Sequence, residues 1–209
     1  MSDSIPVIPY RAELLRKAIH LGALVLPIGI LVLGRTTALW LLVPLAVFAL
    51  SLDVARQRLP SAHRVIARLF APIMRPEEQP PLGGPLILNG AVWMCLSAAL
   101  CAALFREPIA AAALAMLMVG DGAAAVIGRR YGRHRYPFSS KSLEGSLAFF
   151  LTAALIALPL VLLPLPHPPL TPLQLSVGAL VATIVEALPL PVNDNLRAPL
   201  FAGLVMTLL

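Results

Sequence analysis

The sequence contains few charged residues: Asp, Glu, Lys and Arg make up only 12% of its 209 positions. A soluble domain carries about 25%. Hydrophobic residues account for 59% of the chain instead, and its mean hydropathy is +0.87. This composition excludes an ordinary soluble enzyme and predicts an integral membrane protein.

Acidic residues are scarcer than basic ones, at 10 against 16, and there are only two cysteines. In a soluble protein such an excess of basic residues would suggest that the protein binds nucleic acid. Here the cations fall between apolar runs, so we interpret them as orientation signals and expect no nucleic-acid partner. Cys95 and Cys101 lie in one apolar run. Their spacing puts them roughly 240° apart around a helix, which argues against a disulfide between them.

Long apolar runs are the dominant feature, and most approach the ~20 residues that a helix needs to cross a bilayer. The last run is short and ends with the chain. The sequence therefore predicts an all-α, polytopic membrane protein with about seven transmembrane helices, or six if the last run does not cross. We expect a single domain, 1–209. The runs are 17–34, 37–52, 84–105, 109–128, 143–163, 173–190 and 196–209.

The basic residues sort by side if the N-terminus is cytoplasmic. Only Arg35 and Arg106 then lie outside, and the other fourteen lie inside. Because positively charged loops stay in the cytoplasm, this pattern predicts a multi-pass protein of the cell membrane, or the inner membrane in a bacterium. The fourteen are Arg11, Arg16, Lys17, Arg56, Arg58, Arg64, Arg68, Arg75, Arg129, Arg130, Arg133, Arg135, Lys141 and Arg197.

The longest cytoplasmic loop is expected over 53–83. Within it, residues 61–74 are too short and too basic to span, and their apolar positions recur at helical spacing. Arg64 and Arg68 lie one turn apart in the same segment. The pattern is typical of a helix in the membrane interface, although an ordinary connecting helix explains it equally well.

Asp121 is the most informative residue, because it lies inside an apolar run between Gly120 and Gly122. An acid at such depth is costly unless it is used. With the predicted orientation, five acids in the spans or near their ends lie close to the cytoplasmic face. One interpretation is that they only neutralise the basic loops. The other is phosphate chemistry, since carboxylates hold Mg²⁺ and cations hold phosphates. These acids are Asp53, Asp121, Glu144, Glu186 and Asp194.

A basic loop follows Asp121 and ends in Ser140-Lys141-Ser142-Leu143-Glu144-Gly145. Ser142 is placed to cap the next helix, and the exposed N–H groups of that helix start would attract an anion. Lys141 adds a positive charge there. The glycines around this stretch, Gly120, Gly122 and Gly128, would let a phosphate or metal approach the backbone, or simply let helices pack closely.

Two further polar groups are expected at the same face. Arg16 and Lys17 open the first span, and His20 lies one turn farther in. A basic pair is common beside a membrane, but a histidine inside an apolar run is more often functional or hydrogen-bonded than idle. Near the last spans, Glu186 and the Asn193-Asp194-Asn195 turn form the second group.

Taken in order, these residues resemble the CTP-using membrane kinases of lipid alcohols: phytol kinase, dolichol kinase and CTP-dependent diacylglycerol kinase. The resemblance covers most of the chain. The length of the chain is closest to that of the phytol kinases. Each motif is loose, but their order and spacing together are specific. The motifs are Glu13-x-x-Arg16-Lys17-x-x-His20, Asp53-x-x-Arg56, Arg75-x-x-Glu78, Gly120-Asp121-x-x-Ala124-x-x-x-Gly128-x-x-x-Gly132, Lys141-Ser142-x-Glu144-Gly145-Ser146, Glu186 and Asp194-Asn195-x-x-x-Pro199.

The resemblance implies transfer of the γ-phosphate of CTP to a phytol, polyprenol or diacylglycerol hydroxyl at the cytoplasmic face, with Mg²⁺. It implies catalytic roles for Asp121, Lys141 and Glu144, and Mg²⁺ binding by Asp121 with help from Asp194 or Glu144. Supporting roles are expected for His20, Asp53, Glu186 and Asn195. The expected nucleotide-binding residues are Arg16, Lys17, Gly120, Gly122, Gly128, Ser140, Ser142 and Gly145.

Two alternatives remain. A phosphatidate cytidylyltransferase would also use CTP in a membrane, although its aspartate-rich signature near the C-terminus is not evident here. A small transporter or structural membrane protein would need no nucleotide. Charges are almost missing from the outer halves of the predicted spans, which argues against an ion path. The sequence leaves the alcohol, the base and the oligomeric state open.

Overall fold

The computed structural model describes residues 10–164 and 166–209, apart from the side chains of 10–14 and Ile73. Arg11 of the predicted basic face and Glu13 of the first motif thus lie outside the described side chains. The described residues form helices and no strand, with one isolated bridge between Arg135 and Ser142. The predicted all-α class is therefore confirmed.

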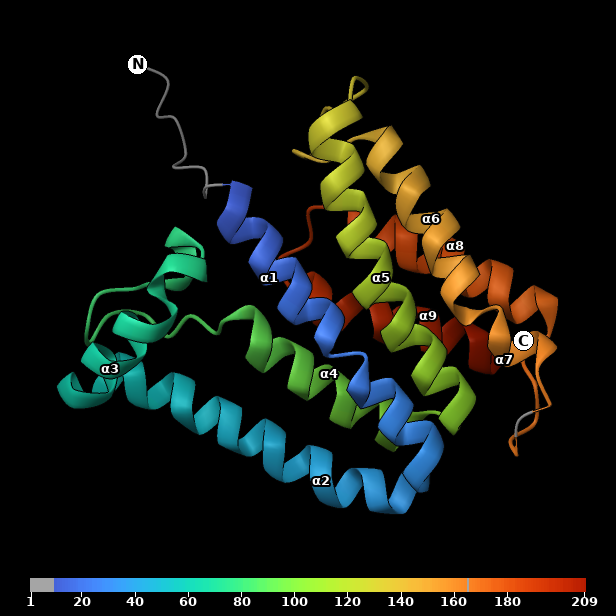
Figure 1. Cartoon of the computed structure of the whole chain (residues 1–209), viewed down its shortest axis with the longest axis horizontal. Helices are drawn as coiled ribbons and strands as arrows, with labels where there is room; N and C mark the ends of the chain where they lie inside the picture. The colour runs from blue at the N-terminus through green and yellow to red at the C-terminus, as the bar shows by residue number, and fades with distance from the viewer. Residues whose placement is uncertain (1–9, 165) are drawn as a thin grey trace.

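The first two predicted spans form a helical hairpin. Helix α1 runs Tyr10–Gly22, and α2 runs Val25–Arg58 with a sharp break at Gly34. Gly34 has φ 75° and ψ 164°, a conformation that glycine adopts without steric cost. Figure 1 shows the chain turning there, so that the long second arm of α2 runs back beneath the first.

The remaining helices form a bundle around α5 (Figure 1). Three described helical stretches are long and apolar enough to cross a membrane: Leu15–Arg58, which contains both arms of the hairpin, Glu107–Tyr131 and Leu143–Leu162. Helices α4 and α8 are apolar but shorter. The chain is thus an all-α membrane protein, and the number of spans stays a prediction. The bundle comprises α4 (Gly90–Leu104), α5 (Glu107–Tyr131), α6 (Leu143–Ala157), α7 (Pro159–Leu162), α8 (Pro172–Ala187) and α9 (Asp194–Leu208).

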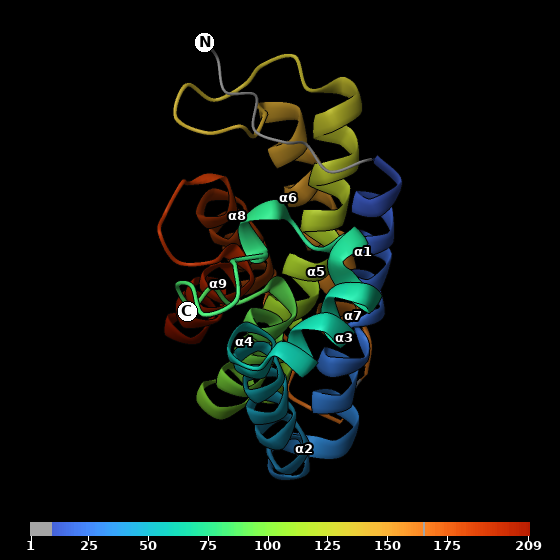
Figure 2. The ribbon, with the colours of Figure 1, turned by 90° about the vertical axis from the view of Figure 1, so that its left-hand side faces the viewer.

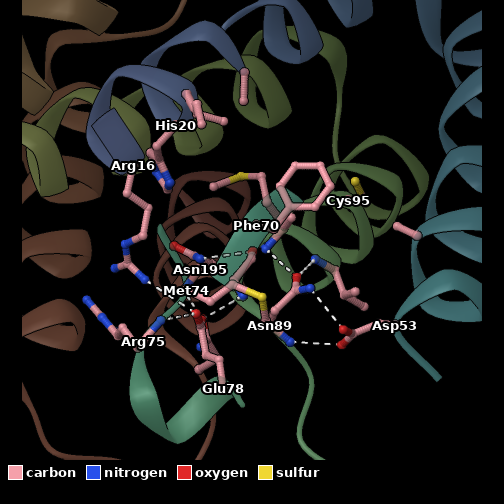
Figure 3. Close-up of a pocket in the computed structure, with 18 of the residues that line it drawn as sticks. Arg16, His20, Asp53, Phe70, Met74, Arg75, Glu78, Asn89, Cys95 and Asn195 are labelled. Carbon is pink, nitrogen blue, oxygen red and sulfur yellow. Dashed lines mark hydrogen bonds and ion pairs between the residues drawn. The ribbon is translucent and has the colours of Figure 1, made fainter. Parts of the chain in front are cut away.

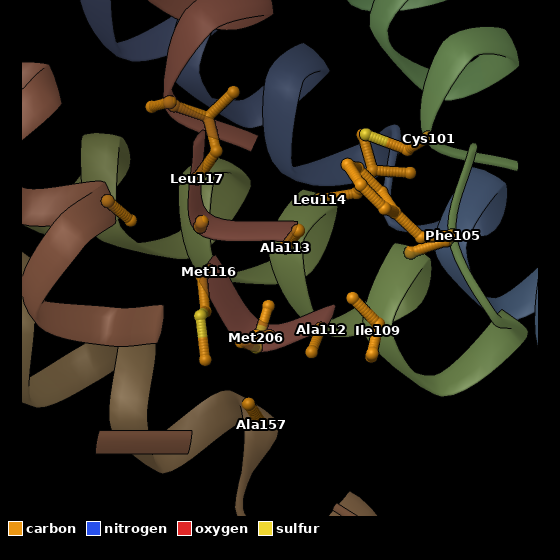
Figure 4. Packing of buried hydrophobic residues seen from close by; sticks show 14 of the residues in the cluster. Cys101, Phe105, Ile109, Ala112, Ala113, Leu114, Met116, Leu117, Ala157 and Met206 are labelled. Atoms are coloured by element: carbon orange, nitrogen blue, oxygen red, sulfur yellow. The ribbon is translucent and has the colours of Figure 1, made fainter. Parts of the chain in front are cut away.

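The N-terminal part of α5 is the centre of the core (Figure 4). Its alanines 110–113, Leu114 and the residues 116–118 are buried, and α5 packs against α2, α4, α6, α8 and α9. Small side chains allow such close helix contacts in a membrane. This buried stretch continues to Gly120 and ends immediately before Asp121, which is only partly buried. The core therefore fixes the position of Asp121.

The segment between α2 and α4 carries the predicted amphipathic helix. Helix α3 runs Pro60–Phe70 and is followed by two single turns, η1 (Ala71–Ile73) and η2 (Pro76–Glu78). None of the described α3 side chains is fully buried. The loop predicted to begin at 53 begins only after Arg58, because α2 continues through the polar residues Asp53, Arg56 and Gln57, which are buried against the chain that follows.

The ends of the molecule differ in charge. At one end Arg35 contacts the carbonyl of Ala103 and the carboxylate of Glu107, and His167 Nε2 donates to Leu31 O at 2.9 Å. The opposite end holds the start of α1 and the basic connection 132–142 (Figure 2). The cations predicted to share a membrane face thus gather away from the Gly34 turn.

Candidate functional site

An ion pair between α1 and α5 forms the centre of the site. Lys17 Nζ donates to Asp121 Oδ2, and His20 Nε2 lies 3.9 Å from the same oxygen. The three side chains are 10%, 14% and 17% exposed for Lys17, His20 and Asp121. Lys17 and His20 are three residues apart, so they share one face of α1. The sequence placed these residues at one face of the membrane, and the structure brings them into contact.

A second cluster joins the ends of three helices around Lys141, which lies just before Ser142, the N-cap of α6. Its ammonium lies 2.6 Å from Glu186 Oε1 and 2.5 Å from Glu186 O, at the end of α8. It also lies 3.3 Å from Asp194 Oδ2, at the start of α9. Glu186 is 3% exposed, and a buried carboxylate needs such a partner. Lys141 thus contacts two carboxylates that lie 45 and 53 positions later in the sequence.

Asp53 belongs to a buried network at the end of α2. It is paired with Arg56, and its two oxygens accept from Asn89 N at 3.0 Å and Asn89 Nδ2 at 2.9 Å. Asn89 Oδ1 in turn caps α4 by accepting from Ala91 N and Val92 N. The supporting role expected for Asp53 is therefore structural in its visible contacts: it fixes the start of α4.

Glu78 and Asn195 hold the other side of that helix start. Glu78 Oε1 accepts from Gly90 N at 3.0 Å, while Asn195 Nδ2 donates to Gly90 O at 3.2 Å. Arg16 Nη1 lies 3.7 Å from Glu78 Oε2 and links the network to α1. A side chain at position 90 would meet Asn195 at 3.3 Å, so glycine allows this close approach.

A cavity of about 380 Å³ connects the Lys17–Asp121 pair to this network (Figure 3). Figure 3 shows Arg16 and His20 reaching it from α1, with Glu78 and Arg75 on the facing side. Asp121 and Asp194 both line it, whereas Lys141 and Glu186 do not. One part of its wall is charged and polar, and the other part is apolar. The apolar lining residues are Ile19, Ala23, Leu26, Ala49, Leu52, Ile66, Phe70, Met74, Ala91, Val92, Met94 and Cys95.

Most of the predicted nucleotide-binding glycines lie at helix contacts. A Cβ at Gly120 would come within 2.8 Å of the Phe149 ring, and one at Gly145 within 3.1 Å of Ala124 O. Gly128 faces Ser142 Oγ in the same way, at 3.2 Å. Packing of α5 against α6 explains these three glycines without a ligand. Gly122 differs, because a Cβ there would meet nothing within 4 Å.

The loop residues 132–145 organise one another. Ser142 Oγ accepts from Gly145 N at 3.2 Å and caps α6, as expected. Glu144 accepts from the backbone and ring of His134, at 2.7 Å for Nδ1, and these are its visible hydrogen bonds. Ser140 O accepts from Arg135 Nη1 at 2.7 Å. Glu144 and Ser140 therefore shape the basic loop, and no described contact joins them to Asp121.

The carboxylates of Asp121 and Asp194 are suitable ligands for an Mg²⁺ ion that also binds a polyphosphate. Within the described residues no three His, Cys, Asp or Glu side chains gather into a metal site. Mg²⁺, however, is usually held by one or two carboxylates together with substrate phosphates and water. Asp121 and Asp194 line one cavity, and each contacts a lysine ammonium, so both positions already accept a cation.

The sequence-based set omitted Asn89, although it connects Asp53 to the start of α4. The sequence does mark Asn89 as a helix N-cap, because an asparagine directly before an apolar run is a preferred cap. Arg56 and Glu78 stood in the motifs but not among the expected site residues. Their buried partners come from distant segments and cannot be read from local spacing.

Comparison with known proteins connects this architecture to lipid-alcohol kinases. The chain is 36% identical over 130 residues to probable phytol kinase 1 of Glycine max, covering 56% of this chain and 43% of that protein. It is 37% identical over 89 residues to dolichol kinase of Saccharomyces cerevisiae, covering 41% of this chain and 17% of that protein. The chain is a relative of the phytol and dolichol kinases.

These relatives are longer proteins, and the matches span less than half of their length. An uncharacterized protein of Rickettsia prowazekii matches more evenly, at 29% identity over 187 residues and 88% of each chain. No family model and no solved structure matches the chain. The predicted resemblance to lipid-alcohol kinases is confirmed.

Proposed function

We propose that this protein is a membrane-embedded kinase that transfers the γ-phosphate of CTP to the hydroxyl of a lipid alcohol at the cytoplasmic face. One observation carries the proposal: at Asp121, a cavity with an apolar wall meets a cluster of carboxylates and lysines. Such a junction suits a reaction between a lipid and a charged nucleotide. The names of the relatives support a lipid alcohol as acceptor.

The donor is assigned to the side of Asp121 that carries Lys141 and the basic loop. Lys141 and the exposed Arg129, Arg130 and Arg133 would neutralise phosphate charge there. Gly122 leaves open space beside Asp121. Phosphoryl transfer needs positioning and charge neutralisation more than covalent chemistry from the protein, and this end of the molecule provides both.

Asp121 and Asp194 would hold Mg²⁺, with the nucleotide phosphates completing its coordination. The bound ion would neutralise charge on the transferred group. Lys17 and Lys141, which contact these carboxylates, would turn toward phosphate oxygens when the ion and nucleotide bind. Arg16 lines the same cavity and adds positive charge.

The transfer forms a bond between the alcohol oxygen and the γ-phosphorus, and breaks the bond from that phosphorus to the β–γ bridging oxygen. CDP leaves, and the hydroxyl proton passes to a base at the junction. CTP rather than another nucleotide follows from the family resemblance, because no base-reading motif stands out in the sequence.

The test is a label-transfer assay with purified protein, Mg²⁺ and γ-labelled CTP or ATP. The acceptors are phytol, geranylgeraniol, longer polyprenols and diacylglycerol. A lipid-alcohol kinase moves the label to the lipid, and EDTA abolishes the transfer until Mg²⁺ is restored. A further arm replaces the alcohol with phosphatidate, from which a cytidylyltransferase would form CDP-lipid and release the label in pyrophosphate. No release and no transfer with any acceptor would favour the non-enzymatic alternative.

A further inference from the structure

The apolar part of the cavity is formed by elements far apart in the sequence. Ala23 and Leu26 come from the first arm of the hairpin, Ala49 and Leu52 from the second, and Cys95 from α4. Ile66 and Phe70 of α3 close it on another side. Both arms of the hairpin thus contribute apolar residues to one cavity, which is also lined by the charged residues Lys17 and Asp121.

The rim of this cavity is also apolar. Ile19, Leu52 and Phe70 line it, yet they are 55%, 42% and 45% exposed, respectively. They come from three different helices, α1, α2 and α3. In a membrane protein, large apolar side chains that stay exposed face hydrocarbon rather than water. The opening is thus suited to molecules that enter sideways from the bilayer.

The inner end of the same cavity is polar. His20 Nε2 is buried there and has no hydrogen-bond partner among the described residues, although it lies 3.9 Å from Asp121 Oδ2. Buried polar atoms normally find such a partner. A hydroxyl placed between His20 and Asp121 would supply it, and would bring the alcohol oxygen to the acid assigned to the metal and phosphate.

We propose that the hydrocarbon chain of the acceptor lies between the two arms of the hairpin, beneath α3, with its hydroxyl at His20 and Asp121. The occupant is a single-chain long alcohol of isoprenoid type. A volume of about 380 Å³ is near the lower end for ligand sites, and part of it belongs to the polar end, so a two-chain diacylglycerol fits poorly. This inference rests on the proposed kinase function only in that it treats the bound alcohol as the molecule that receives the phosphate.

The first experiment blocks the apolar wall with a matched control. Leu52→Trp enlarges a side chain that lines the cavity, whereas Leu45→Trp makes the same change two turns away on α2, outside the lining. The two leucines are 42% and 40% exposed, so both should tolerate tryptophan equally. We expect Leu52→Trp to raise KM for geranylgeraniol at least about fivefold, since overpacking costs ~1 kcal/mol or more. KM for the nucleotide should stay unchanged in both variants.

The second experiment needs no catalysis. A long-chain isoprenoid alcohol with a photoreactive diazirine on its chain is irradiated with the protein in lipid nanodiscs, without nucleotide. We expect cross-links in peptides containing Ala23, Leu52 or Cys95, loss of these cross-links with excess unlabelled alcohol, and a marked reduction in Leu52→Trp but not in Leu45→Trp. Excess diacylglycerol should compete poorly.

The outcomes separate the two proposals. Specific cross-links without any phosphoryl transfer would keep the binding site and refute the kinase function. Transfer that is equally fast in Leu52→Trp, or cross-links only on the outer surfaces of α6 and α8, would keep the kinase and overturn the site. Diacylglycerol competing as well as the isoprenoid alcohol would overturn the single-chain assignment.

Discussion

At the scale of single residues, Asp121 carries the greatest chemical weight, because its carboxylate is partly buried between a lysine and a histidine. Asp121→Asn keeps its shape but removes its charge. We expect kcat with the isoprenoid alcohol and CTP to fall at least about a hundredfold, as when one charge-stabilising group is removed from an active site. Label transfer measures it.

Glu107→Gln provides the control for this change. It makes the same acid-to-amide substitution on the same helix, but at the opposite end, where Glu107 accepts from the backbone of Arg35. Activity should remain within about twofold of the native protein, since Glu107 lies at the opposite end of α5 from Asp121 and its hydrogen bond with Arg35 N is exposed to solvent. Equal losses in both variants would mean that Asp121 acts only through the stability of α5.

Lys141 allows structural and catalytic roles to be separated. Lys141→Met leaves Glu186 buried without its cation, which should cost on the order of 3 kcal/mol and lower Tm. The double variant Lys141→Met, Glu186→Gln removes the unpaired charge, so we expect Tm to recover while label transfer stays low. Thermal unfolding in detergent measures the first effect. Recovery of activity together with Tm would show that Lys141 is only a structural partner.

At the scale of elements, Gly120 and Gly122 should respond differently to alanine. In Gly120→Ala the new methyl group meets the ring of Phe149, which is fully buried and has little room to move. Overpacking of ~1–3 kcal/mol should exceed the gain in helix propensity of about 1 kcal/mol, so Tm falls. In Gly122→Ala the methyl group enters open space, so Tm should not fall.

Activity distinguishes two roles for Gly122. If the nucleotide approaches this space, Gly122→Ala raises KM for CTP while leaving Tm intact. Unchanged KM and Tm would remove Gly122 from the predicted nucleotide-binding set. A loss of Tm in Gly122→Ala as large as in Gly120→Ala would contradict the packing of α5 against α6 described above.

The elements could be predicted from the sequence to a large extent, because apolar runs and turn residues mark them locally. The run ending at 34 stops where Gly34 turns, and the segment 61–74 contains all of α3 except its first residue. Contacts between helices could not be predicted in the same way from the sequence. The pairing of Lys17 with Asp121 depends on how α1 crosses α5, which no local pattern records. Gly120 illustrates the same limit, since its neighbour Phe149 lies on another helix.

At the scale of the whole molecule, the charge difference between the ends makes a prediction about orientation. Arg106 lies at the end with the Gly34 turn and Arg133 in the basic loop, and both are exposed. In a variant whose Cys95 and Cys101 are replaced by alanine, single cysteines at these positions report the side. We expect Arg106→Cys to react with an impermeant thiol reagent in intact cells, and Arg133→Cys to react only after permeabilisation.

This orientation follows from the excess of positive charge around Arg133, which disfavours translocation across the membrane. It matters for the chemistry, because Asp121 and Lys141 lie near the same end and nucleoside triphosphates are cytoplasmic. Labelling of Arg133→Cys in intact cells would place the charged site outside. It would then leave the proposed transfer from CTP without a donor, whatever the lipid bound in the cavity.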